Sequence, residues 1–216
     1  ASVTSAQAAL IQAYENKIVP VFTPPQKRFS ATLFFSGSEF FYGIEFDPKL
    51  SVKNNSNAPL IIGPGSYIQG YLRVDALVTG ALNVEIPDLL RMRFRPSRPI
   101  LPGEHVSVNL PLNTGKLRTL LLTYPQADVD IQFTVYLDPI ENKSGSVENA
   151  LEGTEPIREK IHRSGVILSR DFMIQRLEAL AKGQQGQQIR AVELFTGLLA
   201  EQKAFQTNGA LFKYIQ

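Results

Sequence analysis

The chain has 216 residues, with 22 Lys and Arg side chains against 20 Asp and Glu, so its formal net charge is +2. Hydrophobic residues make up 44% of the sequence, which excludes an intrinsically disordered chain. The absence of Cys excludes disulfide frameworks and thiol nucleophiles, and the presence of only two His residues argues against a histidine-rich catalytic or metal centre. The length predicts one or two domains, and the small charge surplus gives no general attraction to nucleic acid or to a membrane.

Residues 1–27 are expected to form a helix followed by a proline-rich connector. Apolar side chains recur at three- to four-residue spacing over 8–18, which is typical of an amphipathic helix. Pro20, Pro24 and Pro25 then end the helix and extend the chain. The N-terminus lacks the basic start and long apolar stretch of a signal peptide, and no apolar run reaches the length of about 18 residues that a transmembrane helix needs.

Residues 28–140 are predicted to form a β-sandwich. Short runs of alternating apolar side chains recur roughly every 8 to 15 residues, with turns rich in Gly, Pro and Asn between them, as in a sandwich of two antiparallel sheets. Two aromatic runs, 29–35 and 40–46, predict a hairpin. The clearest alternation is expected to bury one face of a strand, formed by Val129, Ile131, Phe133, Val135 and Leu137.

A polar and acidic stretch, residues 141–156, is predicted to be a linker or a long loop, and residues 157–216 are predicted to be a helical segment. In this last part the apolar spacing changes from two residues to three or four. The shared face of its first helix consists of Phe172, Met173, Leu177, Leu180 and Ala181. Ser169 or Asp171 is expected to cap this helix at its start, and Gly183 to end it in a C′ position.

A second helix follows the Gln- and Gly-rich loop at 183–188. Its apolar stripe consists of Ile189, Val192, Phe195, Leu198 and Leu199. Because one helical pair cannot bury both of its faces, we expect either that the pair packs on the sandwich or that the natural chain continues past Gln216.

Three stretches resemble known modules. LPGEHVSVNLPL (101–112) resembles the strand entry of bacterial immunoglobulin-like modules, and LSVKNNSNAPLII (50–62) resembles their earlier strand–turn–strand element. IRAVELFTGLLAEQ (189–202) resembles a HEAT-repeat helix. Together they are similar to large bacterial repeat proteins in which an immunoglobulin-like β-domain adjoins TPR or HEAT helices. This resemblance implies a scaffold or interaction role and no catalytic residues.

The expected fold class is therefore mainly β. It combines an immunoglobulin-like sandwich of two antiparallel sheets with an N-terminal helix and a small, HEAT-like C-terminal helical hairpin.

The most distinctive charged cluster consists of Arg91, Arg93, Arg95 and Arg98. Alternation places the first three on one face of a strand, where guanidinium groups would suit a carboxylate, a phosphate or an acidic partner. The alternative is a solvated sheet face with cross-strand ion pairs. The expected carboxylates are Glu45, Asp47 and Asp75. We favour the ion pairs, because a half-exposed strand needs polar residues on its outer face in any case. Nucleic-acid binding would also need more net charge and aromatic side chains on the same face, and Phe94 points the other way.

A dense aromatic stretch consists of Phe29, Phe34, Phe35, Phe40, Phe41 and Tyr42. Alternate residues of a strand face opposite sides, so one inward face cannot hold all six rings. Phe40 and Tyr42 are therefore candidate contacts for a carbohydrate or peptide ligand. The alternative is that the N-terminal helix covers the outward rings, and the absence of Trp weakens the carbohydrate hypothesis.

No catalytic, cofactor or metal site is predicted. Asp128, Asp130 and Asp138 lack the spacing of a calcium-binding loop and are interpreted as outward-facing strand carboxylates. His105 and His162 have no recognisable nucleophile motif beside them and are expected at the surface.

The sequence thus favours a non-catalytic protein-interaction or scaffold module that belongs to a larger repeat protein. The first alternative is a structural assembly subunit built on a jelly roll of the capsid or surface-layer type, and the second is a carbohydrate- or peptide-binding module. A protein partner is expected, without nucleic acid or membrane, and self-association stays open. The sequence does not indicate a compartment.

Overall fold

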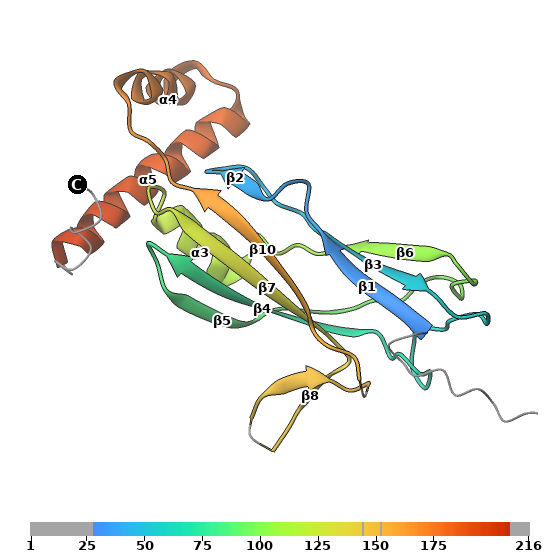
Figure 1. The fold of residues 1–216 in the computed structure, drawn as a ribbon. Helices are drawn as coiled ribbons and strands as arrows, with labels where there is room; N and C mark the ends of the chain where they lie inside the picture. Colours follow the sequence, from blue (N-terminus) through green and yellow to red (C-terminus); the bar gives the residue numbers. More distant parts are fainter. Residues whose placement is uncertain (1–27, 144, 152, 208–216) are drawn as a thin grey trace, which may run out of the picture.

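The computed structural model describes residues 28–143, 145–151 and 153–207 (Figure 1). The helix predicted within 1–27 lies outside these residues. The strands are β1 (Phe29–Phe34), β2 (Glu39–Phe41), β3 (Lys49–Asn54), β4 (Tyr71–Gly80), β5 (Val84–Arg93), β6 (His105–Asn109), β7 (Val129–Leu137), β8 (Pro139–Glu141), β9 (Val147–Asn149) and β10 (Ile157–Ser164). The helices are α3 (Gly115–Thr123), α4 (Arg170–Lys182) and α5 (Gln185–Thr207). None of these helices is long and apolar enough to span a membrane.

Two sheets make up the mainly β body of the molecule. One has the strand order β1-β3-β6, and the other has the order β2-β10-β7-β4-β5. All pairings are antiparallel except the short parallel contact between β2 and β10. The β8–β9 hairpin projects from one end and the helical pair α4–α5 from the opposite end (Figure 1). The predicted arrangement of two sheets with a C-terminal helical pair is confirmed.

The core lies between the two sheets, and β7 runs through its middle. Every second side chain of this strand is buried, from Val129 to Leu137, so the predicted alternation is confirmed. The Phe133 ring stacks on Phe35 at 5.5 Å and meets Phe46 at 5.9 Å between ring centroids. These contacts join the central strand to the aromatic stretch of the chain.

The predicted hairpin between residues 29–35 and 40–46 is wrong. Strand β1 pairs with β3, so that Leu33 lies opposite Leu50, while β2 pairs with β10. The second aromatic run holds three residues in a strand and then turns. Its rings still enter the core, because Phe40 and Phe46 are both buried and contact each other at 5.6 Å.

The predicted start of the helical segment is also wrong, because residues 157–164 form strand β10. This strand lies between β2 and β7, and Ile161 and Arg163 point into the molecule. Its sequence, IREKIHRS, has two apolar residues among eight, so it lacks the regular alternation of apolar side chains that predicts a strand. Within the predicted linker, 141–156, strand β9 pairs with β8.

The ends of α4 agree in part with the prediction. Ser169 caps the helix, since its Oγ accepts a hydrogen bond from the Phe172 N–H at 3.2 Å. Gly183 ends it, but with a φ of −73°, so the left-handed geometry of a C′ glycine is absent. A glycine fits here for a different reason: a Cβ at this position would collide with the carbonyl oxygen of Ala179.

Candidate functional site: the helical end of the sandwich

A buried arginine organises the end of the sandwich that carries the helices. Arg163 of β10 is 3% exposed and donates hydrogen bonds to four backbone carbonyls at the end of α3 and in the turn that follows. These acceptors are the oxygens of Leu121, Tyr124, Pro125 and Ala127. The C-terminal end of a helix presents unpaired carbonyls and partial negative charge, so the guanidinium both satisfies and neutralises it.

Helix α5 docks on this turn through a face that combines small, apolar and acidic residues. Ala191 and Leu194 are buried, and Gly197 lies so close to the backbone that a Cβ would collide with the carbonyl oxygen of Leu122. Glu201 is 1% exposed and accepts hydrogen bonds from the N–H and side-chain amide of Gln126, at 3.2 and 3.3 Å. Burial raises the pKa of the Glu201 carboxyl.

The predicted buried stripe of α5 is therefore wrong for three of its five residues. Ile189, Val192 and Leu199 are 51%, 51% and 68% exposed, whereas Phe195 and Leu198 are half-buried. At Gly197 the helix approaches the α3 turn so closely that no side chain fits between the two backbones. Apolar periodicity thus does not identify the docked face of this helix.

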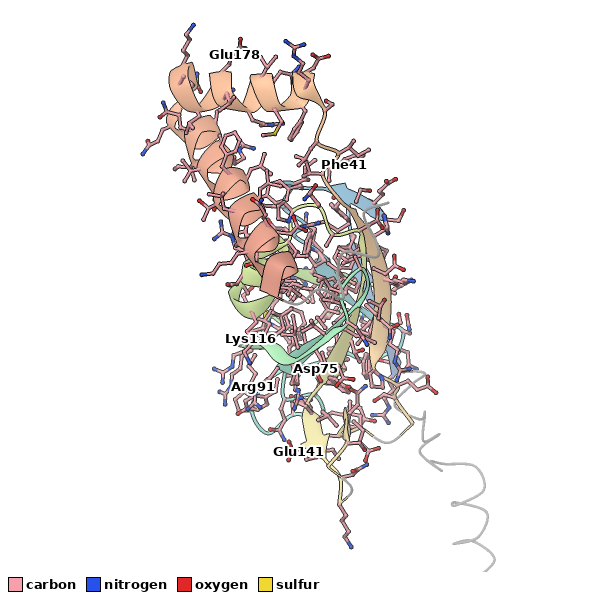
Figure 2. The ribbon with its side chains drawn as sticks, turned by 90° about the vertical axis from the view of Figure 1, so that its left-hand side faces the viewer. Phe41, Asp75, Arg91, Lys116, Glu141 and Glu178 are labelled. Carbon is pink, nitrogen blue, oxygen red and sulfur yellow. The ribbon has the colours of Figure 1, made fainter. Side chains whose placement is uncertain are left out.

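The first helix of the pair leaves its apolar side chains accessible along its length. No residue of α4 is buried, and Ile174 and Leu177 are 44% and 53% exposed. From their connection the two helices diverge, so that α4 stands away from the sheets in both views (Figures 1 and 2). We call the exposed large apolar side chains of this pair the outer apolar residues: Ile174, Leu177, Leu180, Ile189, Val192 and Leu199.

A groove of about 860 Å³ lies between the two helices and the end of the five-stranded sheet. We call it the helical groove. Its apolar lining includes Phe41, Ile44, Ile167, Phe172 and Leu194. Figure 2 shows Phe41 beneath α4, with Glu178 on the opposite side of that helix. Three segments that are distant in sequence therefore contribute apolar surface to one concavity.

Two buried polar atoms, on residues that line the same groove, lack hydrogen-bond partners. The buried Nε of Arg176 and the buried hydroxyl of Tyr42 have no hydrogen-bond partner in the described part of the chain. The Arg176 guanidinium lies over the Phe172 ring, 4.9 Å from its centroid. Burial raises the pKa of Tyr42 to about 12, with a smaller contribution from Glu193, so its hydroxyl stays protonated at neutral pH.

The remaining charged groups of the groove are engaged elsewhere or partly satisfied. Arg190 donates from Nε to the Gly186 carbonyl at 3.2 Å. Glu39 accepts a hydrogen bond from Ser164 at 2.8 Å, and Asp128 lies 3.2 Å from the His162 ring. Among the described residues, neither Arg176 nor Arg190 forms an ion pair.

The predicted arginine cluster is divided. Arg91, Arg93 and Arg95 are exposed, but Arg91 pairs with Asp88, and Arg98 pairs with Glu104 at 3.0 Å in a separate turn. None of the three predicted carboxylate partners pairs with this cluster, and Asp75 binds Arg73 instead. The Asp75 carboxylate already has two closer partners. It binds the guanidinium of Arg73, which lies on the same strand, β4, and it accepts a hydrogen bond from the backbone N–H of Asp88 in β5.

The structure brings Arg91 and Arg93 together with Arg73 beside the β8–β9 hairpin. They line a shallow concavity of about 890 Å³. Arg93 lies over the Tyr71 ring at 4.1 Å, and Arg73 lies over the Tyr136 ring at 6.0 Å. Stacking and ion pairing thus already occupy most of these guanidinium groups.

Of the two candidate ligand-contacting aromatics, Phe40 is placed wrongly by the sequence. It is 4% exposed and belongs to the core, whereas the adjacent Phe41 is 60% exposed. The parallel pairing of β2 with β10 determines which side of β2 faces the core. The number of aromatic residues in this stretch of sequence does not indicate that side. Tyr42 is half-buried and lines the helical groove.

The predicted surface groups without a site role form structural contacts. His162 lies between two carboxylates, with Nδ1 2.9 Å from Asp130 and Nε2 3.2 Å from Asp128, and the Asp130 hydrogen bond raises its pKa. Asp138 does not face outward: it is 8% exposed and accepts hydrogen bonds from the N–H groups of Gln69 and Tyr71. Within the described ranges, no group of three or more His, Asp or Glu side chains is placed to hold a metal ion.

Comparison with known proteins gives distant structural likeness alone. No family model matches the chain, and no curated protein is similar to it. A β-glucosidase from Listeria innocua aligns with 65% of this chain at 11% identity and a TM-score of 0.35. The chain spans about one sixth of that enzyme, since the alignment covers 16% of its length.

Two smaller proteins align in the same way. The sporulation control protein Spo0M from Bacillus subtilis matches over 71% of this chain and 56% of its own, at 15% identity and a TM-score of 0.31. A CARDB domain from Pyrococcus furiosus matches over 65% of this chain and 97% of its own, at 12% identity and a TM-score of 0.26. Likeness at this level does not assign the chain to a family.

Proposed function

We propose that the chain is a non-catalytic protein-interaction module, in which an immunoglobulin-like sandwich holds a HEAT-like helical pair against a partner protein. The observation that carries this proposal is the exposure of the outer apolar residues of α4 and α5 beside the helical groove. Contiguous apolar surface that is rimmed by polar groups is typical of protein-binding regions.

The anchoring of α5 supports this role. Arg163 fixes the α3 turn, and Glu201 and Gly197 hold α5 on it. A helix that is held by a buried hydrogen-bond network presents its opposite face in a defined orientation. A preorganised surface loses less conformational entropy on binding, which favours affinity.

The alternative functions differ in what the surface would do. A carbohydrate-binding module has lost one of its two candidate aromatics, because Phe40 is in the core. A structural assembly subunit would use the outer apolar residues to contact further copies of the chain. Self-association into large assemblies is therefore the competing outcome of the test.

The test begins with the binding protein that the tagged full chain captures, produced as a recombinant partner. Its affinity is measured by isothermal titration for the chain, for Leu177→Ser/Val192→Ser, and for the control Ile61→Ser/Ile140→Ser. The control removes exposed apolar side chains far from the helices. We expect the helical variant to bind at least about tenfold more weakly and the control to bind normally.

Two results would contradict the proposal. One is equal weakening by the two variants, which would place the interface elsewhere. The other is multi-angle light scattering of the chain alone that shows large closed or sheet-like assemblies, dispersed by Leu177→Ser/Val192→Ser. That second result would establish the assembly subunit instead.

A further inference from the structure

We propose that the helical groove recognises a carboxylate on an otherwise apolar segment of the partner protein, so that the partner is an acidic amphipathic peptide or helix. This inference rests on the proposed function and adds the chemical class of the ligand. It is carried by the combination of an apolar lining with two arginines, Arg176 and Arg190, that form no ion pair among the described residues, and with the unpartnered Nε of Arg176.

The donors of the groove point to an anion. Arg176 lines the groove and its buried Nε has no hydrogen-bond partner in the described chain. A buried donor without an acceptor costs free energy, which a ligand acceptor would recover. Arg190 adds a second cation on the facing helix, and neither arginine forms an ion pair among the described residues.

The lining points to an apolar carrier of that anion. Phe41, Ile44 and Ile167 are exposed and present apolar surface in the groove. The Phe172 ring holds the Arg176 guanidinium against its face and so restricts the orientations of this cation. A carboxylate bound by an oriented guanidinium gains geometric specificity as well as charge attraction.

A polyanion and a second copy of the chain fit the groove less well. The same groove is lined by the Glu39 and Asp128 carboxylates, which would repel the many charges of a phosphate backbone more strongly than a single carboxylate. A symmetric contact between two copies would bring Arg176 and Arg190 towards the same two arginines of the second copy. Like charges would then oppose the apolar attraction.

The experiment selects ligands without assuming their sequence. A phage library of random, helix-length peptides is panned on the immobilised full chain, and the selected peptides are synthesised with a fluorescent label. Fluorescence anisotropy then gives Kd for the chain, for Arg176→Gln/Arg190→Gln, for Leu177→Ser/Val192→Ser, and for the matched control Arg95→Gln/Arg158→Gln. The control makes the same change in net charge at exposed positions outside the groove.

We expect the selected peptides to combine Leu, Ile or Phe with Asp or Glu. Loss of the two groove arginines should weaken binding at least about tenfold, and the control pair should leave it nearly unchanged. Replacing the peptide's acid by its amide should weaken binding of the chain by a similar factor and have little further effect on the groove variant. Circular dichroism confirms that each variant is folded.

The remaining outcomes separate the two proposals. Peptides that need Leu177 and Val192 but tolerate loss of their acid and of both arginines would overturn the charge recognition and leave the proposed function intact. If no peptide is selected, or if binding is unaffected by all four substitutions in the helices, both proposals are overturned.

Discussion

Gly197 of α5 lies directly against the carbonyl oxygen of Leu122, at the end of α3. A Cβ on residue 197 would collide with this oxygen and approach the Pro125 ring to 3.2 Å. A glycine in the middle of a long helix costs helical stability, so its presence here reflects the close approach of two backbones.

Gly197→Ala should therefore loosen α5 although alanine favours helices. Overpacking of a close contact costs about 1–3 kcal/mol, which is expected to lower the free energy of unfolding and to speed hydrogen exchange in α5. The matched control is Gly186→Ala in the same helix, where a Cβ meets nothing within 4 Å. This control should be neutral or stabilise by up to about 1 kcal/mol. Equal effects of the two substitutions would show that Gly197 does not set the docking of α5.

We predict that Glu201 stabilises the fold as a buried hydrogen-bond acceptor and that its negative charge is not needed for stability. Glu201→Gln keeps an oxygen for the Gln126 N–H and should leave the free energy of unfolding at neutral pH unchanged or higher. Glu201→Ala leaves that N–H without its partner and should cost about 1–3 kcal/mol. Chemical denaturation measures both, and a Gln variant as unstable as the Ala variant would contradict this role.

The pKa of Glu201 adds a pH signature to the same pair. Because burial raises the folded pKa above the ordinary value of 4.5, the folded state binds the proton more tightly than the unfolded state. Glu201 therefore contributes stability at low pH that is lost as the pH rises from 4.5 through its folded pKa. Glu201→Gln should flatten this part of the stability–pH curve, and an unchanged slope would contradict the assignment.

His162 should stabilise the contact between β10 and its neighbours in its protonated form. Its folded pKa is raised above 6.5, chiefly by the Asp130 hydrogen bond, with Asp128 and Glu39 adding attraction. Its contribution is complete below pH 6.5 and is lost as the pH rises through the folded pKa. Lys160 also binds Asp130, with Nζ 2.8 Å from Oδ2. His162→Gln should remove the decline in the free energy of unfolding above pH 6.5, measured by urea titration at several pH values.

A cut in the β8–β9 hairpin should leave the molecule in one piece. A specific protease site inserted after Lys143 would separate β9, β10, α4 and α5 from the rest of the chain. Since β10 is hydrogen-bonded to both β7 and β2, the two fragments should elute together under native conditions and separate in denaturing gels. Native separation of the fragments would show that the helical part is an independent domain.

The strands with alternating apolar side chains could be predicted from sequence, and β10 could not. In β7 every inward position is apolar, so the period of two is visible. In β10 one of the inward positions is Arg163, whose charge is satisfied by backbone carbonyls that are distant in sequence. A pattern of residue types cannot reveal partners that are so distant in sequence. The sequence therefore predicts that residues 157–164 belong to the helical segment.

The helical groove was missed for a related reason. Apolar periodicity predicts a buried face where Ile189 and Val192 lie, but close backbone contact requires small residues, and α5 docks through Ala191 and Gly197. The three- and four-residue spacing of Ala191, Leu194, Gly197 and Glu201 was the available signal for this face. The groove itself combines three distant segments, so its lining follows from the fold alone.

Hydrogen exchange of the full chain, with and without a saturating amount of the recombinant partner, shows directly whether the helical end binds the partner. On binding we expect slower exchange in α4, in the first half of α5 and around Phe41–Ile44, with no change in β4 and β5. Protection confined to the strands that carry Arg73, Arg91 and Arg93 would contradict this expectation, because the partner would then bind the arginine face and leave the helical end free.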